Sequence, residues 1–315
     1  MEIRIGTSGW NYPTGNGTWN GVFYPRRRGR GFDELAYYAA RFDTVEVNST
    51  FYRMPEAAMS TGWVERTPPG FLFSVKLFQK FTHPRLFAEK SGGAAWDVTP
   101  TDVDLYRTGI DPLASAGRLA AVLLQFPPSF HATPDAKAYL DWLLRALGGY
   151  PLAVELRHRS WSDDARDTAG RLAARRASWA LIDEPKFKSS VEQHRVSFSS
   201  ARPAAGPKTT PDVFYIRLHG RNAKNWWKHD ASEDRYNYLY SGDELEPFAE
   251  VAEETAHAGR RVLMYLNNHF SAKAVANAAL LKHRLGQELP GDYPAEMVDR
   301  YPELDGVVAT SGLRL

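Results

Sequence analysis

The segment at positions 44–52 begins with a strict alternation of side chains. Val45 and Val47 fall on one side of the extended chain. Glu46 and Asn48 fall on the other side, and this two-residue period predicts a β-strand with one polar face. A similar alternation occurs in seven further segments, and this repetition constrains the fold more than any other feature of the chain.

Eight strands are therefore predicted, with helices or loops between them. They cover Ile3–Ser8, the first half of Thr44–Tyr52, Phe71–Leu77, Leu119–Gln125, Leu152–His158, Trp179–Asp183, Val213–His219 and Arg261–Asn268. The predicted helices include Asp33–Arg41 and one that begins near Pro134, with Thr133 as its N-cap. The segment Pro185–Pro211 has four prolines and no helical period, so the connection between the sixth and seventh strands is predicted to be irregular.

Strands that alternate with helices over 315 residues predict an α/β protein built as a single (β/α)8 TIM barrel. A doubly wound open sheet is the competing architecture, but its strands usually bury both faces in continuous apolar runs. One domain is predicted to span residues 1–315, with residues 287–315 as a C-terminal tail packed on it or beside it.

Composition narrows the location and the partners. The chain has no cysteine, which excludes disulfides and thiolate metal sites and favours the cytoplasm. Its first residues read as a strand without a signal peptide, and no apolar run reaches the roughly 18 residues of a membrane span. A net charge of +2 does not favour a nucleic-acid partner, although Arg26, Arg27 and Arg28 form a short basic run.

Polar residues recur where the predicted strands end, which in a TIM barrel is the mouth of the active site. The predicted catalytic residues are Glu46, Glu155, Lys76 and Asp183. The predicted substrate-binding residues are Ser8, Trp10, Asn48, Tyr52, His83, Gln125, Arg157, His158, Trp161, Arg217, His219, Asn267, Asn268 and His269. The same polarity at one end of almost every strand is a stronger signal than any single motif.

Several roles are open to these side chains. Glu46 and Glu155 form a possible acid/base pair, because two carboxylates across a site suit hydrolysis. Lys76 suits a charge clamp, or a Schiff-base amine if it is desolvated. Arg157 and Arg217 suit the binding of a phosphate or a carboxylate in fork geometry. The same charges would also be compatible with a buried structural ion network, which must be paired to offset its desolvation.

A metal site would draw on Glu46, His83, Glu155, His158, Asp183, His219 and His269. No metal-ligand spacing supports such a site, and the interleaved Lys and Arg residues oppose a cation. No Walker loop or complete dinucleotide fingerprint is present. We therefore expect neither a metal nor a cofactor.

A set of short runs in chain order resembles a known family. The runs are Gly6–Trp10, Trp19–Pro25, Val45–Tyr52, Phe73–Lys76 with Thr82 and His83, Leu123–Pro127, Val154–His158 with Ser160 and Trp161, Arg217–Gly220 and Asn267–His269. They resemble the YecE-like family, a domain-of-unknown-function family, over nearly the whole chain. The resemblance implies a TIM-barrel fold and no established activity.

Three functions are compatible with the sequence. The first is an enzyme with acid/base chemistry, hydrolase- or lyase-type, that binds a small anionic sugar- or nucleotide-like molecule at the strand ends. The second is a metal-dependent, nuclease-like protein that binds nucleic acid. The third is a non-catalytic binding or scaffold protein whose interior charges are structural. The sequence favours the first.

Overall fold

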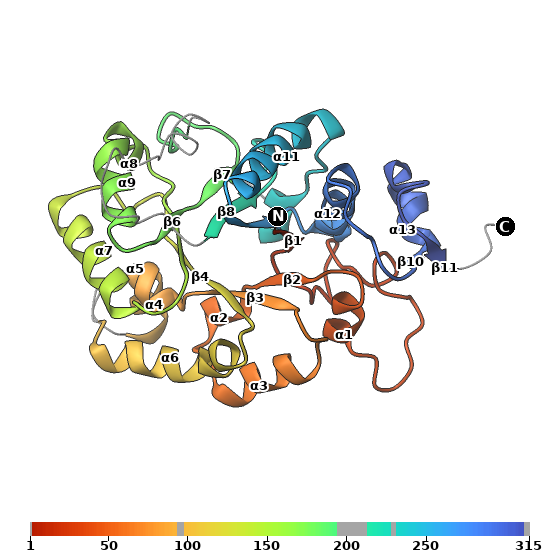
Figure 1. Ribbon diagram of the computed structural model, residues 1–315, viewed down its shortest axis with the longest axis horizontal. Coiled ribbons are helices and arrows are strands. Elements are labelled where there is room, and N and C mark those ends of the chain that lie inside the picture. The colour runs from red at the N-terminus through yellow and green to blue at the C-terminus, as the bar shows by residue number, and fades with distance from the viewer. Residues whose placement is uncertain (1, 93–97, 194–212, 228–230, 312–315) are drawn as a thin grey trace.

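The fold is described here from a computed structural model that covers residues 2–92, 98–193, 213–227 and 231–311. Its long strands form two parallel sheets (Figure 1). The four-stranded sheet has the order β1 (Ile3–Thr7), β9 (Arg261–Leu266), β8 (Val213–Leu218) and β7 (Leu181–Asp183). The five-stranded sheet has the order β2 (Thr44–Val47), β3 (Leu72–Lys76), β4 (Leu119–Gln125), β5 (Leu152–Glu155) and β6 (Ser178–Trp179).

The prediction of a single closed eight-stranded barrel is wrong, because strand pairing is interrupted twice. The predicted sixth strand is divided: β6 pairs with β5, whereas β7 pairs with β8. Ala180 lies between the two parts, and its N–H donates to the carbonyl oxygen of Val154 at 2.9 Å. At the other interruption, an isolated bridge joins Ser8 to Glu46 in place of a continuous ladder. Alternation in a sequence reports which face of a strand is buried, not which strand lies beside it.

A close approach at Gly6 accompanies the second interruption. A Cβ atom on this residue would lie 2.1 Å from the carbonyl oxygen of Thr44, which no side chain tolerates. The N–H of Gly9 then donates to the carbonyl oxygen of Glu46 at 2.7 Å. The end of β1 therefore lies directly beside the end of β2, and the polar residues of the two strands meet there.

Helices surround the strands in Figure 1. They are α1 (Glu34–Ala39), α2 (Ser49–Tyr52), α3 (Ala57–Glu65), α4 (Gln79–Thr82), α5 (Pro84–Ser91), α6 (Pro100–Ser115), α7 (Pro134–Ala146), α8 (Ser160–Asp163), α9 (Ala165–Ala173), α11 (Gly242–His257), α12 (Lys273–Arg284) and α13 (Ala295–Arg300), with 3-10 turns η1 (Ser232–Tyr236), η2 (Phe270–Ala272) and η3 (Pro302–Leu304). The predicted N-cap Thr133 is confirmed, because its side chain accepts from the N–H of Ala136. Most of the segment predicted to be irregular, from residue 194 onward, lies outside the described residues.

The chain adopts an unusual conformation just after β9. Ser271 and Ala272 both have positive φ, 56° and 63°, a region that residues with a side chain seldom occupy. The N–H of Ser271 donates to the carbonyl oxygen of Gly17, and the carbonyl oxygen of Ser271 accepts from the hydroxyl of Tyr301. The guanidinium of Arg300 donates to the hydroxyl of Ser271. The end of α13 therefore holds this turn in place.

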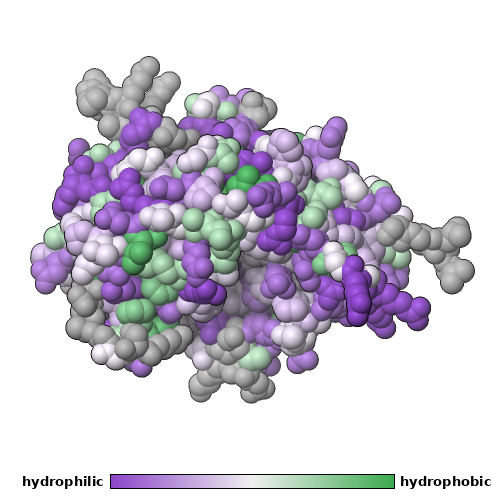
Figure 2. Space-filling model, turned by 90° about the horizontal axis from the view of Figure 1, so that it is seen from below, coloured by the Kyte–Doolittle hydropathy of each residue, from purple (hydrophilic) through white to green (hydrophobic). Residues whose placement is uncertain are grey.

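The last strands form a small parallel pair, β10 (Tyr293–Pro294) with β11 (Thr310–Ser311), beside α13 at the edge of the molecule (Figure 1). Figure 2 shows a face that is mostly hydrophilic, on which hydrophobic side chains form small separate areas. No helix in the described part of the chain is both long enough and apolar enough to cross a bilayer.

Candidate functional site

Arg217 on β8 is the centre of a buried polar cluster at the carboxyl ends of the strands. Its Nε and Nη2 donate to the two carboxylate oxygens of Glu46 on β2, at 2.9 and 2.7 Å. Its Nη1 donates to Gln125 at 2.8 Å and also to Glu155 on β5. Arg217, Glu46 and Glu155 are each at most 1 % exposed, so their charges are balanced within the protein.

The alternation of each strand brings these residues to one face. Glu46 lies in register with Ser74, and Gln125 lies in register with Glu155. Residues in register on neighbouring parallel strands point to the same face, as do residues two apart on one strand. Lys76, two residues after Ser74, therefore faces the same space as Glu46.

A second arginine extends the cluster toward solvent. Nε of Arg157 donates to Glu155 at 2.6 Å, and Nη2 lies 3.2 Å from Nε2 of His219. Nδ1 of His219 accepts a hydrogen bond from the amide N–H of Asn267 at 2.8 Å. Burial lowers the pKa of His219 to about 3, so its imidazole is neutral near pH 7 and carries its proton on Nε2, which lies 3.4 Å from Oε1 of Glu155. Asn267 therefore fixes the tautomer.

The carboxylate of Glu155 stays ionised. Burial by itself raises its pKa, but the charges of Arg217 and Arg157 hold it well below its ordinary value. Burial by itself lowers the pKa of Arg217, but the carboxylates of Glu155 and Glu46 raise it above its ordinary value. Arg217 and Glu155 therefore form a fixed ion pair, and neither is a ready proton donor at neutral pH.

Lys76 differs from its charged neighbours. Within the described ranges, no hydrogen bond or ion pair joins its Nζ to another residue, and Nζ lies 4.2 Å from the ring centroid of Phe51. Burial, and then the charge of Arg217, lower the pKa of Lys76 to about 7 against the opposite effect of Glu46 and Glu155. A large fraction of this amine is uncharged near neutral pH, which makes it a base or a nucleophile.

Phe51 also places His83 near Lys76. The imidazole of His83 packs edge-on against the ring of Phe51 at 4.8 Å, and burial lowers its pKa to about 3. His83 lines a cavity of about 230 Å³ with residues from the end of β4 and the start of α5, among them Pro127, Phe130 and Arg85. His83 is the residue that this cavity shares with the surroundings of Phe51 and Lys76.

Asp183 does not join the cluster. Its neighbour Ile182 lies in register with Arg217, so Asp183 faces the opposite side of β7. Its carboxylate accepts from Nε and Nη2 of Arg221 at 2.9 and 3.1 Å and from the hydroxyl of Tyr240 at 2.7 Å. The next residue, Glu184, faces the cluster instead. The prediction that Asp183 is catalytic therefore selected the wrong one of two adjacent carboxylates.

Several predicted binding residues lie around the cluster, and others lie elsewhere. Ser8 and Asn48 bring buried oxygens that have no hydrogen-bond partner within the described ranges. Trp161 is fully buried and donates to the carbonyl oxygen of Phe130, so it belongs to the core. His158 stacks on His131 at 3.8 Å, which removes it from the charged group. Asn268 binds Asn277 and the backbone of Tyr238.

The remaining predicted residues are aromatic or lie against aromatic rings. His269 stacks on Tyr12 at 4.2 Å and lies 4.8 Å from the ring of Tyr236. Trp10 packs edge-on against Trp63. Tyr52 is 68 % exposed, and its ring packs edge-on against that of Phe51. These side chains surround the cluster rather than take part in it.

Three contributors escaped the sequence analysis. The hydroxyl of Tyr215 donates to Glu46 at 2.7 Å, and that of Tyr265 contacts Thr44 and Ser74 at 2.7 and 2.9 Å. Each tyrosine lies two residues before a polar residue of its own predicted strand, so the two-residue period places it on the polar face. This position in the alternation could have identified both tyrosines from the sequence. Glu184 lies just beyond β7. It could have been predicted only if the exact end of that strand had been known.

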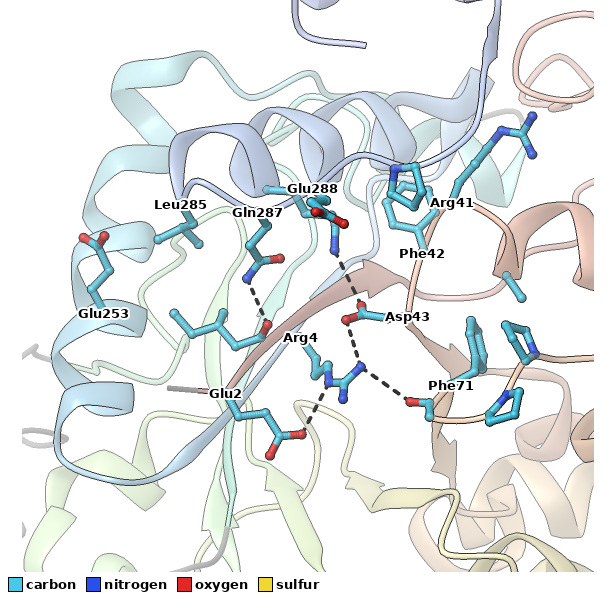
Figure 3. Close-up of a pocket in the computed structure, with 17 residues that line it drawn as sticks. Glu2, Arg4, Arg41, Phe42, Asp43, Phe71, Glu253, Leu285, Gln287 and Glu288 are labelled. Carbon is cyan, nitrogen blue, oxygen red and sulfur yellow. Dashed lines mark hydrogen bonds and ion pairs between the residues drawn. The ribbon is translucent and has the colours of Figure 1, made fainter. Parts of the chain in front are cut away.

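A larger cavity, of about 780 Å³, lies at the opposite ends of the strands (Figure 3). Several of its charged groups are already paired: Arg4 binds Glu2 and Asp43, and Lys282 lies 3.6 Å from Asp43. These are the amino ends of β1, β2 and β3, whereas ligands of open parallel α/β sheets bind beyond the carboxyl ends of the strands. We therefore place the candidate site at the carboxyl ends.

The predicted metal-ligand types do not converge. In the part of the chain that the structure describes, no three His, Asp or Glu side chains form a group that could hold a metal ion. His83, His158 and Asp183 each contact different partners, as described above. The cluster around Arg217 is instead a pairing of carboxylates with arginines.

Comparison with known proteins places the chain in a family. Residues 4–298 match the family described as Protein of unknown function DUF72. The chain belongs to the DUF72 family. It is 28 % identical over 301 residues to the UPF0759 protein YunF of Bacillus subtilis, covering 94 % of this chain and 99 % of that protein. The predicted membership of a family without an assigned activity is confirmed in this form, whereas the YecE-like designation is not carried by these matches.

Two crystal structures of DUF72 proteins share the fold. The one from Thermotoga maritima is 30 % identical, with a TM-score of 0.73, and the match covers 91 % of this chain and 100 % of the other. The one from Enterococcus faecalis is 22 % identical, with a TM-score of 0.73, over 92 % and 98 % of the two chains. The arrangement of strands and helices is thus common to the three proteins.

Proposed function

We propose that this DUF72 protein is an enzyme that performs acid/base chemistry, of the hydrolase or lyase type, on a small anionic sugar- or nucleotide-like molecule. The observation that carries the proposal is Lys76: an almost buried amine that borders a charged cluster without pairing with it. An amine kept only for structure would gain from an ion pair with a neighbouring carboxylate. An unpaired amine with a pKa of about 7 is suited to accept a proton from a substrate.

The other residues divide into a framework and a binding set. Arg217 donates to both Glu46 and Glu155, so the three residues form a framework that fixes the local electrostatic field. Arg157 supplies the positive charge that would hold the anionic group, since it is the more exposed of the two arginines. The unpartnered oxygens of Ser8 and Asn48 would orient hydroxyl groups of the substrate.

The proposal is tested with a panel of phosphorylated and carboxylated metabolites, first by thermal shift and then by calorimetry. Arg157→Gln is expected to weaken binding of a hit at least tenfold, because a charge-assisted bond is lost. Lys76→Met is expected to keep binding but to abolish turnover. Arg221→Gln, a change outside the cluster, is the matched control. An Arg157→Gln protein that binds the hit as the wild type does would overturn the assignment.

A structural role for the whole cluster is the second candidate. The complete pairing of Arg217 supports it, because a closed network needs no ligand. This candidate requires Lys76 to be replaceable by Met with a gain in stability and no change in any ligand response. The same two variants therefore distinguish the two candidates.

A further inference from the structure

Glu184 lies at the edge of the cluster and takes no part in the roles assigned above. It follows β7 directly, on the face that Ile182 shares with Arg217. The residue is only 6 % exposed. Its Oε2 is buried and has no hydrogen-bond partner within the described ranges. A buried carboxyl oxygen without a hydrogen-bond partner lowers the stability of the folded state, so we expect a group that can bind it.

The nearest cation is Arg157, which forms a long ion pair with Glu184 but no hydrogen bond. Nη1 of Arg157 lies 3.6 Å from Oε2 of Glu184, which is outside hydrogen-bond distance. Nε of Arg157 donates to Glu155, and Nη2 lies 3.2 Å from the imidazole of His219. Nη1 has no hydrogen bond to any residue that the structure describes. A donor and an acceptor without a hydrogen bond thus lie side by side, as a long ion pair, at the edge of the site.

We propose that Arg157 and Glu184 form a proton-coupled anion subsite. A carboxylate or phosphate oxygen of the ligand accepts a hydrogen bond from Nη1 of Arg157 and a second one from the protonated carboxyl of Glu184. The proton comes from solvent and is taken up by Oε2 as the anion binds. The inference rests on the proposed function, since it names how the same site would hold its anionic ligand.

Charge balance explains why the proton is needed. Arg157 and Arg217 are already matched by Glu155 and Glu46, so an anion next to an ionised Glu184 would meet a like charge in a dry environment. Protonation removes that repulsion and turns Glu184 from an acceptor into a donor. One ligand oxygen beside the pair can then accept from both residues, because their facing atoms are 3.6 Å apart.

The groups around Glu184 determine its titration. Burial raises the pKa of Glu184; Arg157 and Arg217 act in the opposite direction, together with Lys186 from the following segment, while Glu155 reinforces the rise. His219 is neutral and contributes little charge. Lys76 also titrates near the site, and its protonation would favour anions as well. The test must therefore separate Glu184 from Lys76.

Sulfate is a suitable probe because it does not titrate near neutral pH, and calorimetry in two buffers of different ionisation heat counts the protons taken up. The wild type is expected to take up protons on binding sulfate, with an affinity that falls up to about tenfold per pH unit as Glu184 ionises. Glu184→Gln is expected to bind sulfate with less proton uptake, because the amide already donates. The uptake that remains in Glu184→Gln is expected to vanish in the double variant with Lys76→Met.

Glu192→Gln, which changes a carboxylate paired with Arg159 on the surface, is the control and is expected to match the wild type. Sulfate binding by the wild type with a proton uptake that Glu184→Gln leaves unchanged would overturn this inference alone. Absence of sulfate binding, together with no hit in the metabolite panel, would overturn the anion site itself and the proposed function with it.

Discussion

Arg217 and Glu46 meet through two parallel hydrogen bonds, from Nε to Oε2 at 2.9 Å and from Nη2 to Oε1 at 2.7 Å. The pair joins β8 of one sheet to β2 of the other, and both side chains are buried. The remaining guanidinium nitrogen reaches Glu155 and Gln125. One side chain thus connects the two sheets at the end where the polar residues collect.

Replacing Arg217 by Met is expected to lower the free energy of unfolding by about 3–5 kcal/mol, because two carboxylates remain buried without their counter-charge. Urea denaturation measures the change. The control is Arg221→Met, whose side chain is 37 % exposed and whose loss should cost clearly less. A loss below about 1 kcal/mol in Arg217→Met would show that the pairing is not needed to hold the sheets together.

The titration of Lys76 predicts a specific pH dependence of stability. The pKa of Lys76 is lowered in the folded state to about 7 from 10.5, so between these values the unfolded chain holds a proton that the folded one lacks. Stability therefore rises with pH across this window, and the burial cost is largest below pH 7. The contribution is on the order of several kcal/mol.

Lys76→Met removes this contribution. The difference in unfolding free energy between the wild type and Lys76→Met is expected to shift in favour of the wild type from pH 7 to pH 10. Subtracting the variant cancels the titration of all other groups that the substitution leaves unchanged. A difference that stays constant over this range would mean that Lys76 remains protonated and that its role as a base must be abandoned.

A substitution at Asp183 tests whether this residue has only a structural role and lies outside the anion-binding site. Asp183→Asn is expected to lower stability by about 1–3 kcal/mol, since it weakens bonds from Arg221 and Tyr240. Sulfate binding is expected to be unchanged, because Asp183 faces away from Arg157. Glu155→Gln is the matched variant inside the cluster and should alter both stability and binding. Loss of sulfate binding in a folded Asp183→Asn protein would contradict the assignment.

The sequence predicts the polar face of the site well, because the two-residue alternation along a strand can be read from neighbouring residues alone. Glu46, Lys76 and Arg217 share a face for the reason that made them predictable: each sits at the polar position of an alternating strand. Glu184 was missed because a shift of one residue reverses the face, and the end of a strand is not fixed by alternation alone.

The rest depended on contacts between distant segments. The division of the predicted sixth strand at Ala180 follows from pairing with β5 on one side and β8 on the other, which no local pattern encodes. Trp161 looked like a residue of the site mouth, but the carbonyl oxygen of Phe130 accepts its indole N–H in the core. The pKa of Lys76 likewise depends on the charges that surround it, and the residues that carry these charges come from three other strands.

The turn at Ser271 and Ala272 has a consequence for the last helix. Both residues keep a backbone conformation that costs energy, and the hydroxyl of Tyr301 and the guanidinium of Arg300 restrain it from outside the two sheets. The turn follows Asn267, which fixes the tautomer of His219. A chain cut after residue 290 would retain every strand of both sheets and yet lose this brace. The truncated protein would remain folded, but the segment that follows β9 would exchange between several conformations.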